Sequence, residues 1–291
     1  MLQSSPTSEV PPTPHNGAPA LNLTARPLIV QSYGLTDRGL VRATNEDQFV
    51  TATLMRALCV EQSSVPQSTV HYADNRSYVF IVADGVGGVE GGEKASALAV
   101  GAIEEFLLGI DGSADTSVLR EFKEALQNAD ACVCAAAAKE PGLHGMGTTL
   151  TMAYSRGSDL FVAHVGDSRC YLFRRSMLHR LTHDDTLVNA MVEGGLLAPE
   201  KAAAHDFRHI ITNVIGGSRP GIHAEVHRID LEQGDVLLLC TDGLTGMLTD
   251  DRIATTLATM SSPQEACEQL VQIANEQGGE DNVTVVVVRY L

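Results

Sequence analysis

The chain of 291 residues is short of positive charge: 20 Lys and Arg residues stand against 36 Asp and Glu residues, for a net charge of −16. Nucleic acids demand a basic surface, so this balance argues against a nucleic-acid-binding protein. It also argues against binding to an anionic membrane surface. Long apolar runs and a basic start followed by an apolar stretch are missing as well. We therefore expect neither a membrane span nor a leader peptide.

Cysteine is scarce and scattered. Only Cys132 and Cys134 lie close together, and on a helix that spacing points them to different faces. No disulfide framework or zinc site is expected, and the cysteines are predicted to be small core residues in a reducing cytoplasm. The six positions are 59, 132, 134, 170, 240 and 267.

Two common phosphate-handling signatures are absent. The sequence has no GxxxxGK[ST] loop, which argues against a P-loop nucleotide enzyme, and it lacks the HRD/DFG set of a protein kinase. The glycine-rich segment 84–92 could suggest a dinucleotide loop, but Asp84 at its head would repel pyrophosphate. A loop whose backbone approaches a metal ion closely is the better interpretation.

What the chain does have is carboxylates where strand-like runs begin or end. Such groups are costly to gather in a protein interior unless positive charge holds them together. If the runs alternate in direction, the carboxylates lie along one sheet edge. Oxygen donors without a nearby Cys or His pattern favour Mg²⁺ or Mn²⁺ over zinc or copper. Glu46, Asp47 and Asp281 open a run, whereas Asp84, Asp167 and Asp242 close one.

An acid beside glycine is also typical of an ordinary turn, and for a single such pair the turn is the preferred interpretation. Here every acidic patch adjoins a strongly apolar run. This repetition favours a polynuclear site for hard metal ions.

The order of elements predicts one domain over residues 26–291, preceded by a disordered tail over residues 1–25 that is rich in Pro, Ser and Thr. Helices are expected in pairs, over 92–109 and 116–139 and again over 250–259 and 263–277. Segregated strands and paired helices favour an antiparallel β-sandwich covered by helices. Polar, irregular sequence predicts an excursion over 54–77, and short helices are expected over 184–205. Strands are expected over 48–54, 79–83, 148–154, 159–165, 169–174, 223–229, 235–240 and 283–290.

Six segments in this order resemble the motifs of the metal-dependent type 2C protein phosphatases, and the compact form is similar to the bacterial branch. The resemblance covers roughly residues 29–291. It implies an α+β fold in which an antiparallel β-sandwich is flanked by pairs of helices on both faces, in four layers. It also identifies residues 184–215 with a segment called the flap, which would help select substrate; a surface connection without a role is the alternative. The six segments are 36–47, 82–88, 147–149, 165–169, 241–244 and 281–284.

The resemblance implies two Mn²⁺ or Mg²⁺ ions and a third ion. Asp84 would bridge the pair. Asp242 and Asp281 would complete the shell of the first ion, and Glu46 with the Gly85 carbonyl would bind the second. Asp167, with Asp242, would hold the third. Behind these ligands, Asp47 would orient metal-bound waters, and Asn282 would lie beside it.

Arg42 is the residue expected to grip the substrate phosphate, because an arginine fork matches two phosphate oxygens. The alternative is a partner for nearby acids. With Arg42 and Asp84 as catalytic residues, a metal-bridging water would attack phosphorus directly, without a phosphoenzyme. Val86 departs from family members that carry His there, so a metal-bound water is expected to protonate the leaving alcohol.

Histidines elsewhere are expected to be structural. His164 lies within an apolar strand and is predicted to be a core residue. His144 and His183 stand near motifs without forming a ligand pattern. His205 and His209 have helical metal-ligand spacing but are expected to face solvent.

The resemblance thus implies a cytoplasmic, monomeric serine/threonine protein phosphatase that acts on phosphorylated proteins and opposes a cognate Ser/Thr kinase. Two alternatives stay open. A catalytically silent relative would bind phosphoproteins, although such relatives are expected to lose metal carboxylates. A small-metabolite phosphatase on the same fold would share every motif and differ only in substrate.

Overall fold

The structure is a computed structural model that describes residues 28–55, 57–59, 70–72, 76–87, 91–110, 115–202, 205–218 and 221–291. The tail expected over residues 1–25 lies outside the described residues, as do Gly88 and most of the excursion expected over 54–77. Among the described helices, none has the length and apolar character that crossing a membrane requires.

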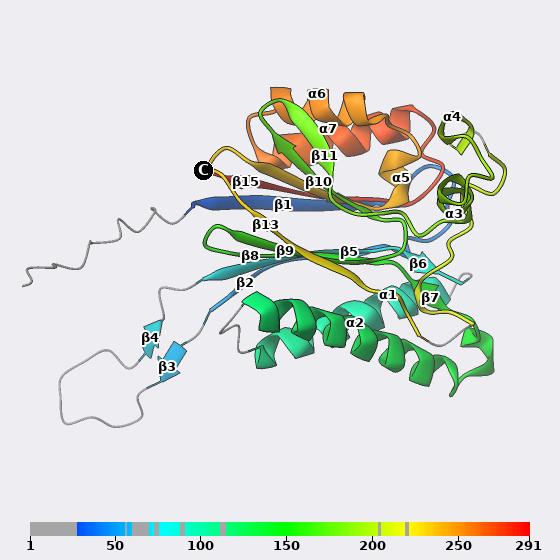
Figure 1. The fold of residues 1–291 in the computed structure, drawn as a ribbon, viewed down its shortest axis with the longest axis horizontal. Coiled ribbons are helices and arrows are strands. Elements are labelled where there is room, and N and C mark those ends of the chain that lie inside the picture. Colours follow the sequence, from blue (N-terminus) through cyan, green and yellow to red (C-terminus); the bar gives the residue numbers. More distant parts are fainter. Residues whose placement is uncertain are drawn as a thin grey trace, which may run out of the picture.

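Two antiparallel five-stranded sheets pack face to face (Figure 1). In spatial order, the first sheet contains β1 (Val30–Asp37), β15 (Val283–Tyr290), β14 (Val236–Cys240), β10 (Arg169–Arg174) and β11 (Met177–Arg180). The second contains β13 (Glu225–Asp230), β9 (Asp159–Val165), β8 (Leu150–Arg156), β5 (Ser77–Ala83) and β2 (Gln48–Leu54).

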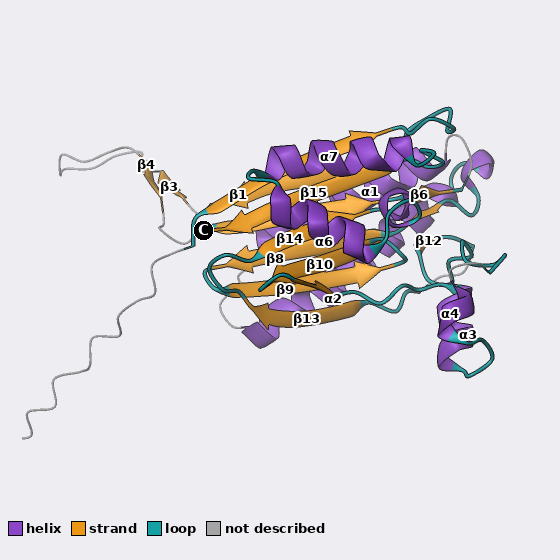
Figure 2. Cartoon of the chain, turned by 90° about the horizontal axis from the view of Figure 1, so that it is seen from above, coloured by secondary structure: helices purple, strands orange, loops and turns teal. Residues whose placement is uncertain are grey.

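Helices cover the outer face of each sheet, which confirms the expected α+β sandwich (Figure 1). Figure 2 shows α6 (Asp250–Thr259) and α7 (Pro263–Glu276) lying over the first sheet. Helices α1 (Gly91–Gly109) and α2 (Asp115–Ala137) cover the second. The starts of α6 and α7 are fixed by local sequence. Thr249 and Ser262 are their N-caps and accept hydrogen bonds from the Arg252 and Glu265 amides.

The shorter elements gather mainly at one end of the sandwich, opposite the C-terminus (Figures 1 and 2). The flap contains two short helices there, beyond the strand ends. The elements at this end are α3 (Leu187–Glu193), α4 (Pro199–Ala202), α5 (Asp242–Thr245), the 3₁₀ turn Pro141–Leu143 and the strands β6 (Gly85–Val86), β7 (Gly147–Thr148) and β12 (Ile215–Gly216). Away from it lie β3 (Ala57–Cys59) and β4 (Val70–Tyr72), which pair with each other.

Three apolar clusters fill the spaces between the four layers, and strand periodicity explains them. In β5, Val79 and Ile81 pack toward α1 and α2, whereas Phe80 and Val82 pack between the sheets. Alternate side chains point to opposite faces of a strand, so a strand covered on both sides is apolar throughout. The third cluster lies between the first sheet and helices α6 and α7.

Strand register carries the acidic patches to the same end of the sandwich. Gln48 pairs with Ala83, so Asp47 and Asp84 project from neighbouring strand ends. Likewise, Cys240 pairs with Val285, which places Asp242 near Asp281. Leu150 pairs with Val165 just before Asp167. The expectation of a single sheet edge is wrong in this respect: the carboxylates come from two sheets, because the strands that bear them divide between the layers.

Two further features differ from the sequence-based expectation. Strand β1 has no alternating apolar pattern and was not predicted from periodicity. Cys170, Cys240 and Cys267 are buried as expected, but Cys132 is exposed and Cys134 only half-buried. The core-facing side of α2 is formed instead by Ala125, Leu126, Ala129 and Val133, which leaves Cys132 on the outward side.

Candidate functional site

Most of the predicted site residues surround one cavity of about 590 Å³ at the acidic end of the sandwich. Asp167 is separate and lines a second cavity of about 390 Å³, which shares His209, Asp242, Glu280 and Asp281 with the first. Asp47 lines neither cavity and lies buried behind them. The predicted residues in the larger cavity are Arg42, Glu46, Asp84, Gly85, Asp242, Asp281 and Asn282.

Asp84 and Asp242 meet at the boundary between the two sheets. Both side chains line the larger cavity, although Asp84 follows β5 and Asp242 opens α5. Burial raises the pKa of Asp84 well above its usual range, and the neighbouring Asp47 and Asp242 raise it further. Burial also raises the pKa of Asp242, with Asp281 as the next cause. Without added positive charge, this pair therefore tends to hold a proton.

Asp47 is held from behind by two hydroxyl groups. Thr241 and Thr284 donate hydrogen bonds to Asp47 Oδ2 at 2.8 and 2.7 Å. Its Oδ1 atom is buried and has no hydrogen-bond partner. Burial raises the pKa of Asp47 to about 7, although the two hydroxyl bonds act in the opposite direction. Oδ2 of Asp47 is thus held in place, whereas Oδ1 can still accept a hydrogen bond.

Asn282 joins the N-terminal ligand loop to the start of β15. Its side-chain oxygen accepts a hydrogen bond from the Glu46 amide at 2.9 Å. Its side-chain nitrogen donates to the carbonyls of Arg38 and Thr44. These bonds fix Glu46 relative to Asp281, the residue next to Asn282. Asn282 therefore supports the loop that carries Glu46, and its role behind the metal ligands stays a prediction.

Arg42 forms an ion pair with Asp281, with Nη2 and Oδ2 2.6 Å apart. The structure therefore contains the contact foreseen by the alternative interpretation of Arg42. The Arg42 side chain is still 57% exposed, and the hydrogen bond to Asp281 raises the pKa of its guanidinium, so the charge persists. Because a guanidinium has five N–H donors, a single carboxylate contact leaves several donors for another anion.

The backbone at Gly85 and Gly92 approaches Glu46 too closely for a side chain. A Cβ on Gly92 would collide with Glu46 Oε2 and would lie 2.8 Å from the Gly85 carbonyl carbon. Burial raises the pKa of Glu46, partly offset by Arg42. Two glycines of this loop thus lie against Glu46, and the interpretation of the loop as a metal loop stays a prediction.

Asp167 lies behind Asp242, on a tight turn after β9. It is 7% exposed, and its Oδ1 atom has no hydrogen-bond partner. Burial raises its pKa well above the usual range, with Asp242 as the next cause. The preceding Gly166 has φ of +109° and a Cβ there would lie 2.6 Å from Thr149 Cγ2, so the turn requires glycine.

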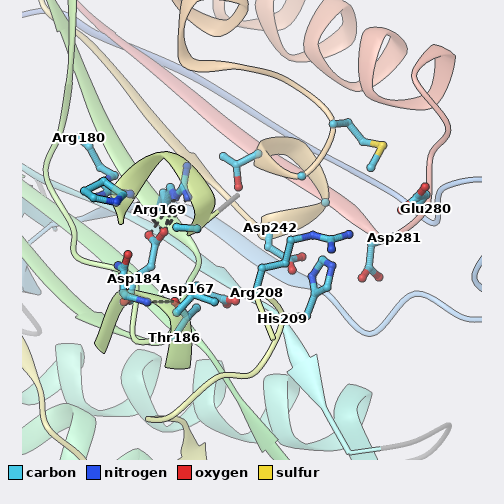
Figure 3. A pocket seen from close by; sticks show the side chains of 18 residues that line it. Asp167, Arg169, Arg180, Asp184, Thr186, Arg208, His209, Asp242, Glu280 and Asp281 are labelled. Atoms are coloured by element: carbon cyan, nitrogen blue, oxygen red, sulfur yellow. Dashed lines mark hydrogen bonds and ion pairs between the residues drawn. The ribbon is translucent and has the colours of Figure 1, made fainter. Parts of the chain in front are cut away.

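The flap contributes to both cavities, and sequence reasoning missed most of this contribution. His209 is exposed, as expected, yet it lines both cavities. Figure 3 shows Arg208 and His209 beside Asp242, with Asp167 close by. Glu280 lines both cavities too, and its only signal in the sequence is its position before Asp281.

His164 is a buried core residue, as predicted. Its Nε2 atom lies 3.0 Å from the Gly166 carbonyl and 2.9 Å from the His183 carbonyl, so this nitrogen carries the proton. Nδ1 accepts from the Thr151 hydroxyl at 2.8 Å. Burial lowers the pKa of His164, which favours the neutral ring.

The donors fit hydrated, hard divalent ions. Asp47, Asp167 and Asp242 each hold a buried oxygen without a hydrogen-bond partner. Among the described residues, no three Asp, Glu, His or Cys side chains form a group that could hold a metal ion by themselves, so waters would have to supply further ligands. Mg²⁺ characteristically binds through one or two carboxylates and keeps several waters, so an open, all-oxygen site suits ions of this kind.

Known proteins resemble this chain in sequence and in fold. Residues 61–277 match the model of the family described as Protein phosphatase 2C. The serine/threonine phosphatase stp of Listeria welshimeri is 32% identical over 87% of this chain and 93% of its own length. Serine/threonine protein phosphatase PstP of Mycobacterium tuberculosis is 34% identical over 89% of this chain. The match covers only 45% of the length of PstP, so this chain spans about half of that relative. A crystal structure of the PstP catalytic domain in complex with two manganese ions superposes with a TM-score of 0.73 at 31% identity, covering 91% of this chain and 99% of that one.

Proposed function

The chain belongs to the protein phosphatase 2C family, and from that premise we propose that it is a metal-dependent protein serine/threonine phosphatase. Its reaction is the hydrolysis of phosphoserine and phosphothreonine monoesters. The observation that carries this proposal is the gathering of carboxylates from separate strand ends around one cavity whose mouth holds an exposed arginine.

The proposed cofactors are two Mn²⁺ or Mg²⁺ ions and a third ion. Asp84 would bridge the pair, with Asp242 and Asp281 on one ion and Glu46 and the Gly85 carbonyl on the other. Asp167 and Asp242 would hold the third. When bound, such ions lower the pKa of water and neutralise charge on a phosphoryl group. The raised pKa values of Asp84, Asp167 and Asp242 support this assignment, because bound cations would offset both the burial and the mutual repulsion that raise them.

The remaining steps fall to side chains and water at the site. Arg42 orients the phosphate through the donors that Asp281 leaves available. Asp47 uses its unpartnered Oδ1 atom to hold a water, while Thr241 and Thr284 fix the other oxygen. Val86 lines the cavity and has no proton to donate, so a water of the site protonates the leaving alcohol.

We further propose a cytoplasmic monomer with a cognate Ser/Thr kinase as its opponent. The free thiols of Cys132, Cys134, Cys170, Cys240 and Cys267 support a reducing compartment. The silent-relative alternative is disfavoured, because every expected metal carboxylate is present. The metabolite-phosphatase alternative shares the same site and must be separated by substrate.

The test is hydrolysis of a phenyl phosphate and of a phosphothreonine peptide, with and without Mn²⁺. Asp84→Asn and Asp242→Asn are compared with wild type and with Asp251→Asn, the same change at an exposed position of α6. We expect Mn²⁺-dependent turnover, lowered at least about 100-fold in the two cavity variants, since losing groups that merely support ligands costs 10–100-fold.

Three outcomes would change the proposal. A wild-type protein without metal-dependent turnover is not a phosphatase. Full turnover in both cavity variants would show that the site is assigned wrongly. A kcat/KM for phosphorylated sugars or nucleotides above that for phosphopeptides would favour the metabolite alternative.

A further inference from the structure

Asp185, at the root of the flap, bonds to chain segments far apart in sequence. Its amide donates to the Gly166 carbonyl at 2.7 Å, and its Oδ2 atom accepts from the Gly166 amide at 3.0 Å. Oδ2 also accepts from the Asn213 side chain at 2.7 Å. Its carbonyl accepts from the Thr212 amide at 2.7 Å and from the Thr212 hydroxyl at 3.0 Å. One residue therefore joins both limbs of the flap to the turn after β9.

The limbs pair only briefly beyond this point. Thr186 forms an isolated antiparallel bridge with Ile211, and the Leu187 amide donates to the Ile210 carbonyl at 2.8 Å. These residues, 185–187 and 210–213, form the base of the flap. On the returning limb, the residue directly before Ile210 is His209, which lines both cavities. The register at Asp185 therefore determines where Arg208 and His209 lie relative to Asp242.

The other side of the same contact reaches the candidate metal ligands. Gly166 immediately precedes Asp167, and its turn packs against Thr149. The Thr149 hydroxyl contacts the Asp84 amide and the Ser168 hydroxyl, at 2.9 and 2.7 Å. Thr149 and Asp185 thus both contact the Asp167 turn, and Asp185 also holds the flap.

We propose that Asp185 is a positioning residue that sets the register of the flap base against the Asp167 turn, and so places the flap residues that receive a phosphoprotein. The placement is a property of the fold; its effect on substrates rests on the proposed function. The recognised ligand is the polypeptide around a phosphorylated Ser or Thr, which extends beyond the phosphate toward the flap.

The experiment compares Asp185→Ala with Asp185→Asn. Alanine removes both side-chain bonds, whereas one asparagine oxygen can accept both, as Oδ2 does. The matched control is Asp235→Ala, because Asp235 is a buried carboxylate that accepts bonds from Arg174 and the Glu232 amide, away from both cavities. Thr212→Val removes only the hydroxyl bond and serves if Asp185→Ala does not fold.

The first readout needs no activity: trypsin cleavage after Lys201 and Arg208, both in the flap, followed by mass spectrometry. We expect roughly tenfold faster cleavage in Asp185→Ala, as for the loss of hydrogen bonds to a charged group. Asp185→Asn should restore the wild-type rate, Thr212→Val should show a smaller increase, and Asp235→Ala should leave the rate unchanged. Equal cleavage in Asp185→Ala and wild type, or the same increase in Asp235→Ala, would overturn the proposal.

The second readout is the division of effects between KM and kcat in Mn²⁺. For a phosphothreonine peptide, Asp185→Ala should raise KM about tenfold, whereas KM for a phenyl phosphate, which has no polypeptide for the flap, should stay within about twofold. An equal rise in KM for the peptide and for the phenyl phosphate would reject a role of Asp185 in receiving the polypeptide. If the wild type hydrolyses neither substrate, the proposed function fails and the cleavage comparison alone decides the role of Asp185.

Discussion

Glu46 shows how much a single carboxylate can depend on a neighbouring residue without a side chain. We expect Gly92→Ala to displace Glu46, because the new Cβ would collide with Oε2 and press on the backbone of Gly85. The Mn²⁺ concentration for half-maximal turnover should rise roughly tenfold, within the range for lost support of a metal ligand.

The matched control lies on the same helix. A Cβ added to Gly101 of α1 would meet no neighbouring segment within 4 Å, so Gly101→Ala should leave the Mn²⁺ dependence unchanged. The same change should add about 0.5–1 kcal/mol of helix stability. Identical Mn²⁺ curves for Gly92→Ala and wild type would place Glu46 outside the metal centre.

Arg42 provides a second test at a single residue. Arg42→Ala should lower kcat/KM for a phosphothreonine peptide by about 10–100-fold, because charged hydrogen bonds contribute about 1.5–3 kcal/mol. Arg42→Lys should recover part of the loss, since lysine keeps the charge and loses the planar fork. If Arg42→Ala leaves kcat/KM unchanged, Arg42 does not bind the phosphate and serves only as the ion-pair partner of Asp281.

Between elements, the start of the flap is fastened to β10 by a buried ion pair. Arg169 contacts Asp184 through Nε and Nη2 at 2.6–3.1 Å, and the two side chains are 22% and 9% exposed. We expect Arg169→Met to lower the free energy of unfolding by about 3 kcal/mol, because it leaves a buried carboxylate without its main partner. Arg180, 3.2 Å from Asp184, keeps the loss from being larger.

Denaturation in urea provides the measurement, with Arg120→Met as its control. Arg120 pairs with Glu124 on the surface of α2, at 71% and 56% exposure, and such pairs contribute under about 1 kcal/mol. Equal losses in the two variants would mean that the Arg169–Asp184 pair does not fasten the flap.

The sequence predicts elements better than it predicts their pairing. Apolar periodicity was enough to find α1, α2, α6 and α7 and the buried strands, whereas β1 escaped because its residues do not alternate. The acidic residues could be selected by their positions at strand ends. The division of these residues between two sheets could not be predicted, because it depends on which strands pair. The contacts of Asp185 could not be predicted either, because its partner Asn213 is distant in sequence.

Across the whole molecule, the gathered carboxylates predict an unusual dependence of stability on pH. Burial raises the pKa of Asp47 to about 7 and raises those of Asp84, Asp167 and Asp242 as well. An unfolded Asp has a pKa near 4, so between about pH 4 and 7 the unfolded chain binds fewer protons than the folded one. These groups therefore make the metal-free protein less stable as pH rises through that window. His164 acts in the opposite direction below about pH 6.5, because burial lowers its pKa.

The check is thermal unfolding in EDTA and in Mn²⁺ at pH 5, 6, 7 and 8. The increase in Tm caused by Mn²⁺ should grow with pH, because ions bind the deprotonated carboxylates. Asp47→Asn should weaken the decline of Tm with pH in EDTA. A Mn²⁺ effect that does not change with pH would contradict the assigned role of the buried carboxylates.

The most direct test of the metal centre is equilibrium dialysis of Mn²⁺ against the full chain. We expect at least two ions to bind per wild-type chain, and at least one fewer to bind to Asp84→Asn, because Asp84 is assigned to both ions of the pair. Asp251→Asn should bind as the wild type does. Binding of fewer than two ions by the wild type, or undiminished binding by Asp84→Asn, would contradict a polynuclear centre at this end of the sandwich.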